Sequence, residues 1–292
     1  MTDEEITRSS RVLGLLFQAL PMISTLHAPN NALYALLSDL AKASSQVLYG
    51  PKGPQRADFG PFGNIEFPYH QMGTITSVDL FGIDELIIFS FYWRNRERYR
   101  NVADIGANIG LHSVLLARCG FNVRSFEPDP RHHAVLQAML ERNGANSVVG
   151  HLAAVSTSDG ESEFIRVLGN TTGSHLAGAK AAPYGALDTF TVRTEAFAPV
   201  LAWADLVKMD VEGHEKTLLL STSGKSWLGK DAIAEIGSPE NAVAIYEHFS
   251  RERVAMFAQK TGWGRVVSPR DMPTSYRDGS LFISGSGRDP WL

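Results

Sequence analysis

The feature that most restricts how this sequence can fold is a regular alternation of short apolar runs and helical patterns, which begins near residue 101. Residues 101–105 have the pattern of a short buried strand, and residues 109–118 place Leu111 and Leu115 at helical spacing. Runs such as VADI, LVKMDV and AIAEI lack polar alternation, which is typical of parallel strands buried on both faces. The sequence therefore predicts an α/β fold with a mostly parallel sheet and helices on both faces.

Local signals divide this region into further elements. Asp129 followed by Pro130 predicts the start of a helix, and Asn143 with Gly144 predicts its end. The strands expected after the first cover residues 123–127, 147–155, 163–167, 190–193, 206–211 and 232–236. A long helix is expected from residue 238 to about residue 260, followed by a closing hairpin of residues 265–268 and 280–284.

The first 75 residues differ from the rest of the chain in their residue pattern. Residues 1–49 show two stretches of leucines at helical spacing, separated by Pro29, and residues 50–75 are rich in proline and glycine, with a short strand expected near residues 65–67. We therefore expect an N-terminal helical extension with a Gly/Pro-rich loop at residues 1–75, and the α/β domain at residues 76–292.

Composition excludes several classes of protein. Hydrophobic residues make up 44% of the 292 residues, charged residues make up 20%, and the net charge is −4, so the chain resembles a globular protein rather than a nucleic-acid binder. The single cysteine, Cys119, excludes an intrachain disulfide and a zinc site built on cysteines. No apolar run approaches the length of a transmembrane segment, and the acidic start does not resemble a secretory signal, so a cytoplasmic location is expected.

The first strand and the turn after it are where a ligand site is expected, because ligands of such sheets bind beyond the carboxyl ends of the strands. Positions 102–112 read VADIGANIGLH. A dinucleotide fingerprint starting at Gly106 would also need glycines at 108 and 111, where this chain has Asn108 and Leu111. NAD-dependent redox chemistry is therefore disfavoured. Asp104, the glycine turn and a fresh helix N-terminus suit a smaller anion such as a carboxylate.

Glu127 ends the second strand, 21 residues after Gly106. An acidic side chain about 20 residues after the first glycine is where a ribose diol is held in nucleotide-binding sheets, because one carboxylate accepts hydrogen bonds from both hydroxyls. A ribose contact, a seat for a carboxylate and no pyrophosphate loop together favour S-adenosylmethionine over NAD.

The segments DIGANIG, FEPDP and VKMDVEGHE resemble the FkbM family of S-adenosylmethionine-dependent methyltransferases, and the likeness runs from about Gly73 to Ser284. The resemblance implies a class I methyltransferase, Rossmann-like fold with a seven-stranded sheet and a final antiparallel strand. It also implies methyl transfer mostly to hydroxyls of sugars, glycolipids or polyketide-like metabolites, so the expected partner is a small-molecule or carbohydrate acceptor. The N-terminal helices lie outside the likeness.

Carried over by position, the resemblance also implies a set of cofactor contacts. His112 falls where related enzymes contact the methionine carboxylate, and Ala154 falls in the stretch that faces adenine. The remaining residues assigned to the cofactor pocket are Asp104, Gly106, Asn108, Gly110 and Glu127.

The segment from Lys208 to Glu215 is the second group of residues that carry chemistry. Lys208 and Asp210 point the same way in a strand, and a lysine inside a buried sheet needs an acidic partner such as Asp210 or Glu235. A satisfied structural ion pair is one reading of this segment. The catalytic reading assigns Asp210 and Lys208 to the active site, with Asp210 as a contact of the methionine ammonium and His214 as the base that accepts the substrate proton.

Asp210 and Glu235 end adjacent strands, so they are also candidates to share a hard cation such as Mg²⁺.

The adjacent His132 and His133 are expected to be a surface pair, and Asp79 is a candidate substrate contact. The sequence leaves open the acceptor, the metal requirement and homo-oligomerisation. N- or carboxyl-methylation of a small molecule and non-catalytic cofactor binding are the alternatives to O-methylation.

Overall fold

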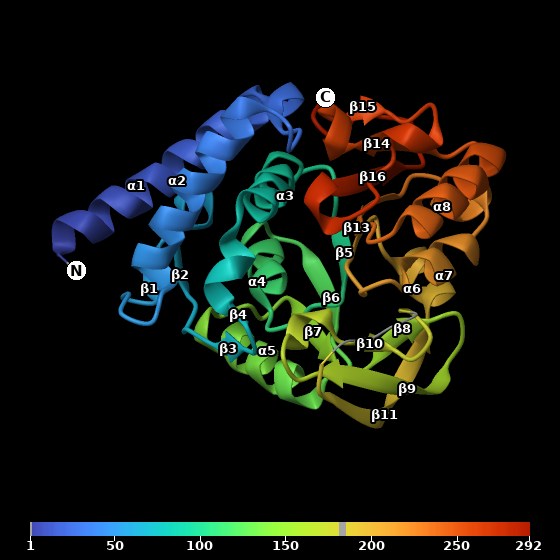
Figure 1. The fold of residues 1–292 in the computed structure, drawn as a ribbon, viewed down its shortest axis with the longest axis horizontal. Coiled ribbons are helices and arrows are strands. Elements are labelled where there is room, and N and C mark those ends of the chain that lie inside the picture. The colour runs from blue at the N-terminus through green and yellow to red at the C-terminus, as the bar shows by residue number, and fades with distance from the viewer. Residues whose placement is uncertain (1, 181–184) are drawn as a thin grey trace.

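The central element of the computed structural model is an eight-stranded sheet with the strand order β15-β14-β16-β13-β12-β5-β6-β7 (Figure 1). Residues 2–180 and 185–292 are described below. The strands β5, β6, β7, β12 and β13 are parallel, whereas β16 runs antiparallel to both of its neighbours. The bounds of these strands are β5 Asn101–Ile105, β6 Asn122–Phe126, β7 Val148–His151, β12 Leu206–Met209, β13 Asp231–Glu235, β14 Ala255–Ala258, β15 Gly264–Arg265 and β16 Ser280–Ser284.

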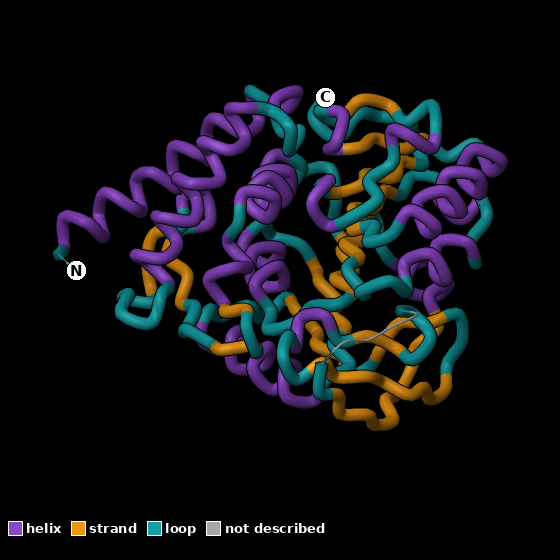
Figure 2. The backbone as a smooth tube through the Cα atoms, viewed as in Figure 1, coloured by secondary structure: helices purple, strands orange, loops and turns teal. Residues whose placement is uncertain are grey.

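Helices cover both faces of this sheet, as the sequence predicted (Figure 2). Side chains alternate along each strand, so Val102 faces one hydrophobic core whereas Ala103 faces the other. The helices of the first core are α3 Ile83–Arg94, α4 Leu111–Arg118 and α5 Pro130–Arg142, and those of the second are α6 Phe197–Trp203, α7 Glu215–Leu220 and α8 Pro239–Glu252. None of the described helices is long and apolar enough to cross a bilayer.

The N-terminal region forms the two expected helices, α1 Asp3–Ala19 and α2 Ala32–Tyr49, which pack on α3 (Figure 1). Leu13 and Leu48 belong to the same continuous hydrophobic core as Val102 of the central sheet. The Gly/Pro-rich segment contains the short hairpins β1 Arg56–Asp58 with β2 Asn64–Glu66, and β3 Gln71–Met72 with β4 Ile75–Thr76. The division at residue 75 stays a prediction, and the extension is joined to the α/β region by this shared core.

Three expectations about the C-terminal half and the sheet are wrong in detail. The helix expected to reach residue 260 ends at Glu252, and residues 255–258 form β14 instead. Residues 280–284 do not form a hairpin with 265–268, because β16 inserts between β13 and β14. The sheet has eight strands rather than seven, since the two-residue β15 adds an edge next to β14.

A second, four-stranded sheet is inserted between β7 and α6 (Figure 1). The strand expected at residues 147–155 is divided between the two sheets, because β7 ends at His151 and β8 begins at Ala154. The bounds of the inserted strands are β8 Ala154–Ser156, β9 Gly160–Val167, β10 His175–Leu176 and β11 Leu187–Ala196. Residues 170–174, between β9 and β10, line the same cavity as residues at the carboxyl ends of the central strands.

Candidate active site

A cavity of about 610 Å³ opens at the carboxyl ends of β5, β6, β12 and β13. Residues 170–176, called the cover segment below, form part of its wall. This cavity is lined by seven of the residues that the sequence analysis assigned to the site, namely Gly106, Asn108, Glu127, Ala154, Asp210, His214 and Glu235. Asp79, the candidate substrate contact, also lines it, and its carboxylate accepts hydrogen bonds from the backbone and side chain of Thr76.

Four other residues expected at the site lie behind the cavity wall. Asp104 is fully buried, with its Oδ2 accepting a hydrogen bond from Ser113 Oγ at 2.7 Å. Gly110 packs against Leu136 of α5 with a φ of 93°, so its role is the tight entry into α4. Two of the four contact residues that line the cavity, because His112 pairs with Glu85 and Lys208 donates to the carbonyl of Gly106.

The turn after β5 is tightly packed against the loop after β12. Gly106 has a φ of 79°, and its N–H and that of Ala107 both donate to the carbonyl of Phe126 at 3.0 Å. A Cβ atom at Gly106 would lie 1.7 Å from the carbonyl oxygen of Asp210. Glycine is required here because the backbone of another strand end occupies the space, which the sequence could not show.

Glu127 is 6% exposed, and both of its carboxylate oxygens accept backbone hydrogen bonds. Oε2 accepts from the N–H of Asn108 and Oε1 accepts from the N–H of Asp129, each at 2.8 Å. Burial raises the pKa of Glu127 to about 8, and the nearby Asp129 also favours the protonated form. Asn108 has a φ of 51°, and its side-chain Oδ1 is buried without a hydrogen-bond partner among residues 2–180 and 185–292.

Lys208 is the buried cation beneath the site. It lies opposite Asp104 in the β12–β5 register, and its Nζ donates to the carbonyl of Gly106 at 3.0 Å. The same Nζ lies 3.7 Å from Asp104 Oδ1 and 3.7 Å from Asp210 Oδ2. Burial disfavours the charge, but Asp210 and Asp104 outweigh it and raise the pKa of Lys208, so this side chain stays protonated. The ion pair that the sequence suggested is therefore present, with Asp210 as one partner.

Asp210 and Glu235 both line the cavity, at the ends of β12 and β13. Burial raises the pKa of Glu235 well above its usual range, and Asp210 and Glu212 raise it further. Within residues 2–180 and 185–292, no group of three or more His, Cys, Asp or Glu side chains is arranged to hold a metal ion. The structure therefore gives no support to the Mg²⁺ site suggested for Asp210 and Glu235.

The loop between β12 and α7 carries His214. Glu215 fixes this loop, because its carboxylate accepts from the N–H groups of Val211 at 2.7 Å and Gly213 at 2.8 Å. His214 lines the cavity, with its Nε2 3.2 Å from Ser156 Oγ, and burial lowers its pKa. The imidazole is therefore neutral at pH 7, the form that can accept a proton.

His112 does not line the cavity, but its side chain pairs with a residue that does. Its Nδ1 lies 3.0 Å from the hydroxyl of Tyr92, and its Nε2 lies 2.9 Å from Glu85 Oε2. Burial opposes ionisation of Glu85, but His112 and Lys208 outweigh it and lower the pKa of Glu85. The wall of the cavity thus contains the Glu85 carboxylate.

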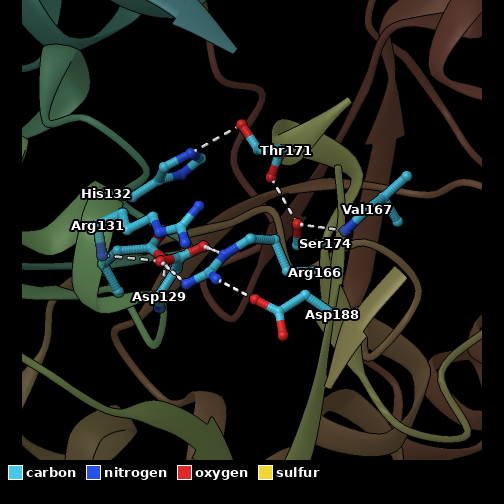
Figure 3. Close-up of polar contacts among 9 residues, drawn as sticks. Asp129, Arg131, His132, Arg166, Val167, Thr171, Ser174 and Asp188 are labelled. Carbon is cyan, nitrogen blue, oxygen red and sulfur yellow. Dashed lines mark hydrogen bonds and ion pairs between the residues drawn. The ribbon is translucent and has the colours of Figure 1, made fainter. Parts of the chain in front are cut away.

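Several cavity residues were missed in the sequence. Asp84 and Glu85 lie in an apolar run, residues 80–93, that forms α3 where no helix was expected. The expectation of a surface pair is wrong for His132, which is 9% exposed, lines the cavity and lies 2.9 Å from Thr171 Oγ1 (Figure 3). The position of His132, three residues after the N-cap Asp129 of α5, was the only signal that it faces this sheet edge.

Comparisons with known proteins show the family to which this chain belongs. A family model described as the methyltransferase FkbM domain matches residues 104–261, more than half of the chain. No curated protein matches the sequence.

The solved structures that are similar to this chain include one cofactor-bound protein and two methyltransferases. Cofactor-bound Rv0187 from MTB is 15% identical, over 69% of this chain and 80% of that one, with a TM-score of 0.37. The O-methyltransferase from Bacillus cereus in complex with SAH is 14% identical, over 67% and 78%, with a TM-score of 0.37. Precorrin-6y C5,15-methyltransferase from Geobacter metallireducens GS-15 is 10% identical, over 69% and 87%, with a TM-score of 0.38. These scores are too low to support any argument about the site.

The family match begins at Asp104 and extends past Glu235, so it includes the ends of β5, β6, β12 and β13 that form the cavity. The chain belongs to the FkbM family and is an S-adenosylmethionine-dependent methyltransferase.

Proposed function

We propose that this methyltransferase acts on a hydroxyl group of a sugar, glycolipid or secondary metabolite, and that His214 is the base that takes up the hydroxyl proton. The observation that carries the proposal is one cavity whose wall contains Glu127, Asp210 and a neutral His214. A neutral imidazole accepts a proton from a hydroxyl near neutral pH, which an ammonium such as Lys208 cannot do.

The residues present fit S-adenosylmethionine. Glu127 would accept hydrogen bonds from the ribose hydroxyls, because the backbone N–H groups of Asn108 and Asp129 hold both of its oxygens in place. Asn108 Oδ1, which has no hydrogen-bond partner in the described part of the chain, and the carboxylate of Asp210 would accept from the methionine ammonium. The bound cofactor supplies a sulfonium methyl group to a nucleophile. Ala154 would lie near adenine, as the family resemblance implies.

The charge of the cavity wall affects which class of methyl acceptor can bind. Besides Glu127 and Asp210, the described wall contains five carboxyl groups and one lysine, Lys180; the carboxyl groups are those of Asp79, Asp84, Glu85, Glu212 and Glu235. Lys180 is paired with Glu212 at 2.5 Å. Among these groups Glu85 is favoured in its ionised form, so a carboxylate acceptor would be repelled by this part of the wall, whereas an amine would be attracted. N-methylation of an amine is therefore the second candidate, and carboxyl-methylation is disfavoured.

The test of the proposed function is calorimetry with S-adenosylmethionine, followed by an assay of methyl release over a panel of neutral polyols, amines and carboxylic acids. We expect turnover with hydroxyl acceptors, and turnover confined to amines would replace the first candidate with the second. A cytoplasmic location and homo-oligomerisation stay predictions from the sequence.

Glu127→Ala is expected to weaken S-adenosylmethionine binding roughly ten- to a hundredfold, because hydrogen bonds to a charged acceptor contribute about 1.5–3 kcal/mol. The pKa of about 8 adds a pH dependence. Ribose hydroxyls donate to the ionised form, so affinity is expected to rise as pH increases through about 8, with release of a proton on binding. Calorimetry in two buffers of different ionisation enthalpy measures that proton.

Glu127→Gln should abolish this pH dependence while keeping the shape of the side chain. Glu141→Gln, at an exposed position on α5, is the matched control and should bind like the parent protein. A pH-independent affinity in the parent protein, or an unchanged affinity in a folded Glu127→Ala variant, would remove Glu127 from the ribose site.

A further inference from the structure

Arg166 joins the inserted sheet to the N-terminus of α5 through a buried ion pair (Figure 3). Its Nε donates to Asp129 Oδ2 at 2.6 Å and its Nη2 donates to Asp129 Oδ1 at 2.7 Å, a two-point contact between planar groups. The residues Arg166 and Asp129 are 5% and 1% exposed. The third donor, Nη1, reaches Asp188 Oδ2 at 2.6 Å, and the guanidinium lies 4.5 Å from the ring centroid of Phe190.

Asp129 in turn holds one oxygen of Glu127. The N–H of Asp129 donates to Glu127 Oε1, and only Pro128 separates the two residues in the chain. Asp129 Oδ1 also accepts from the N–H of Arg131, which makes Asp129 the N-cap of α5. A shift of the Asp129 side chain therefore moves the N–H group on which the orientation of Glu127 depends.

Charge connects the same three residues. The negative charge of Asp129 opposes ionisation of its neighbour Glu127. Burial disfavours the charge on Asp129, but its hydrogen bonds with Arg166 outweigh that cost and lower the pKa of Asp129. Without Arg166, Asp129 would be a buried carboxylate with no cationic side chain at ion-pair distance among the described residues.

The strand that carries Arg166 leads directly into the cover segment. β9 ends at Val167, and Ser174 Oγ accepts from the N–H of Val167 and donates to the carbonyl of Thr171 (Figure 3). Thr171 Oγ1 lies 2.9 Å from Nε2 of His132 on α5. The inserted sheet is thus attached to α5 at two points, and both points adjoin the cavity that holds Glu127.

We propose that Arg166 is a positioning residue for the cofactor, which acts through Asp129 to hold Glu127 in the orientation that receives the ribose hydroxyls. The inference rests on the ribose contact proposed for Glu127. It makes the inserted sheet a part of the cofactor site, although no strand of that sheet supplies the ribose ligand itself.

The test compares Arg166→Lys with Asp188→Asn. Lysine keeps the positive charge but cannot make the two-point contact with Asp129. We expect Arg166→Lys to weaken the affinity for S-adenosylmethionine and S-adenosylhomocysteine at least tenfold, and to raise KM for S-adenosylmethionine while kcat changes less than threefold. Asp188→Asn removes only the half-exposed partner of Arg166 and should bind the cofactor like the parent protein.

Two further measurements separate positioning from a general loss of structure. S-adenosylhomocysteine without its ribose 2′-hydroxyl should bind the parent protein more weakly than the intact molecule, and Arg166→Lys should reduce this difference. In the Glu127→Ala background, Arg166→Lys should cost less than a further twofold in affinity, because the group that it positions is gone.

The outcomes are distinct. A folded Arg166→Lys variant with parental affinity, or a loss that adds in full to that of Glu127→Ala, overturns the inference. If Glu127→Ala itself binds normally, the proposed ribose contact fails first. If Arg166→Lys does not fold, Asp129→Asn, which keeps the backbone N–H and the shape of the side chain, is expected to show the same loss of affinity and of hydroxyl discrimination, and parental behaviour would overturn the inference.

Discussion

Gly106→Ala is expected to abolish detectable S-adenosylmethionine binding and to lower the thermal stability of the protein. The new Cβ would lie 1.7 Å from the carbonyl oxygen of Asp210, so β5 and β12 could not keep their present positions. The N–H of Asp210, which donates to the carbonyl of Ile105 at 3.0 Å, would be displaced with them. Thermal denaturation and calorimetry with S-adenosylmethionine measure the two effects.

Gly120→Ala is the matched control for this prediction. Gly120 has a φ of 87°, close to that of Gly106, but a Cβ there would meet no atom of the described residues within 4 Å, apart from its own chain neighbours. The control therefore measures the cost of a left-handed alanine alone, about 1–2 kcal/mol, without the collision. Equal destabilisation by the two variants, with cofactor binding retained in both, would show that the contact between the two strand ends is not needed.

His214→Ala is expected to reduce turnover about 10²–10⁴-fold while leaving the affinity for S-adenosylmethionine nearly unchanged, because it removes the proposed base without touching the proposed cofactor contacts. Burial lowers the pKa of His214, so the neutral base is already present at pH 7. The rate of the parent enzyme should therefore stay level at neutral pH and fall only below the ordinary imidazole pKa of about 6.5, as the imidazole becomes protonated. Steady-state kinetics over pH 5–9 with a hydroxyl acceptor measure both effects.

His133→Ala is the control, since His133 lies on α5 outside the cavity wall and interacts with Gln137. It should turn over like the parent protein. Parental turnover by His214→Ala would move the search for the base to Asp79, the candidate substrate contact named from the sequence, where Asp79→Asn is the next variant.

The order of strands and helices along the α/β region could largely be predicted from the sequence. Buried parallel strands require apolar runs, and helix ends require caps. The sequence therefore identified the strands VADI and AIAEI and the helix start at Asp129–Pro130. The same local chemistry marked Gly106, Asn108, Glu127 and His214 as residues at strand ends, which is why they line one cavity.

Segments whose partners are distant in sequence were predicted less well. β14 was taken for the end of a helix, because four apolar residues do not distinguish a short strand from a helical turn. Its place was decided by pairing with β16, more than twenty residues later. Helix α3 is apolar on nearly all sides, since it packs between α2 and α4 within the first core, and therefore lacks the amphipathic pattern that identifies a surface helix.

The sequence by itself determined the fold class, the cofactor-type turn and the acid at the end of β6, because these depend on residue types within a few positions of one another. Only the tertiary structure decided which of those residues face the cavity. It placed Asp104 and Lys208 beneath the site, since a buried charge must find a partner across neighbouring strands. It also brought Arg166, His132 and the cover segment to the cavity, because contacts between an inserted sheet and α5 depend on packing that no local pattern encodes.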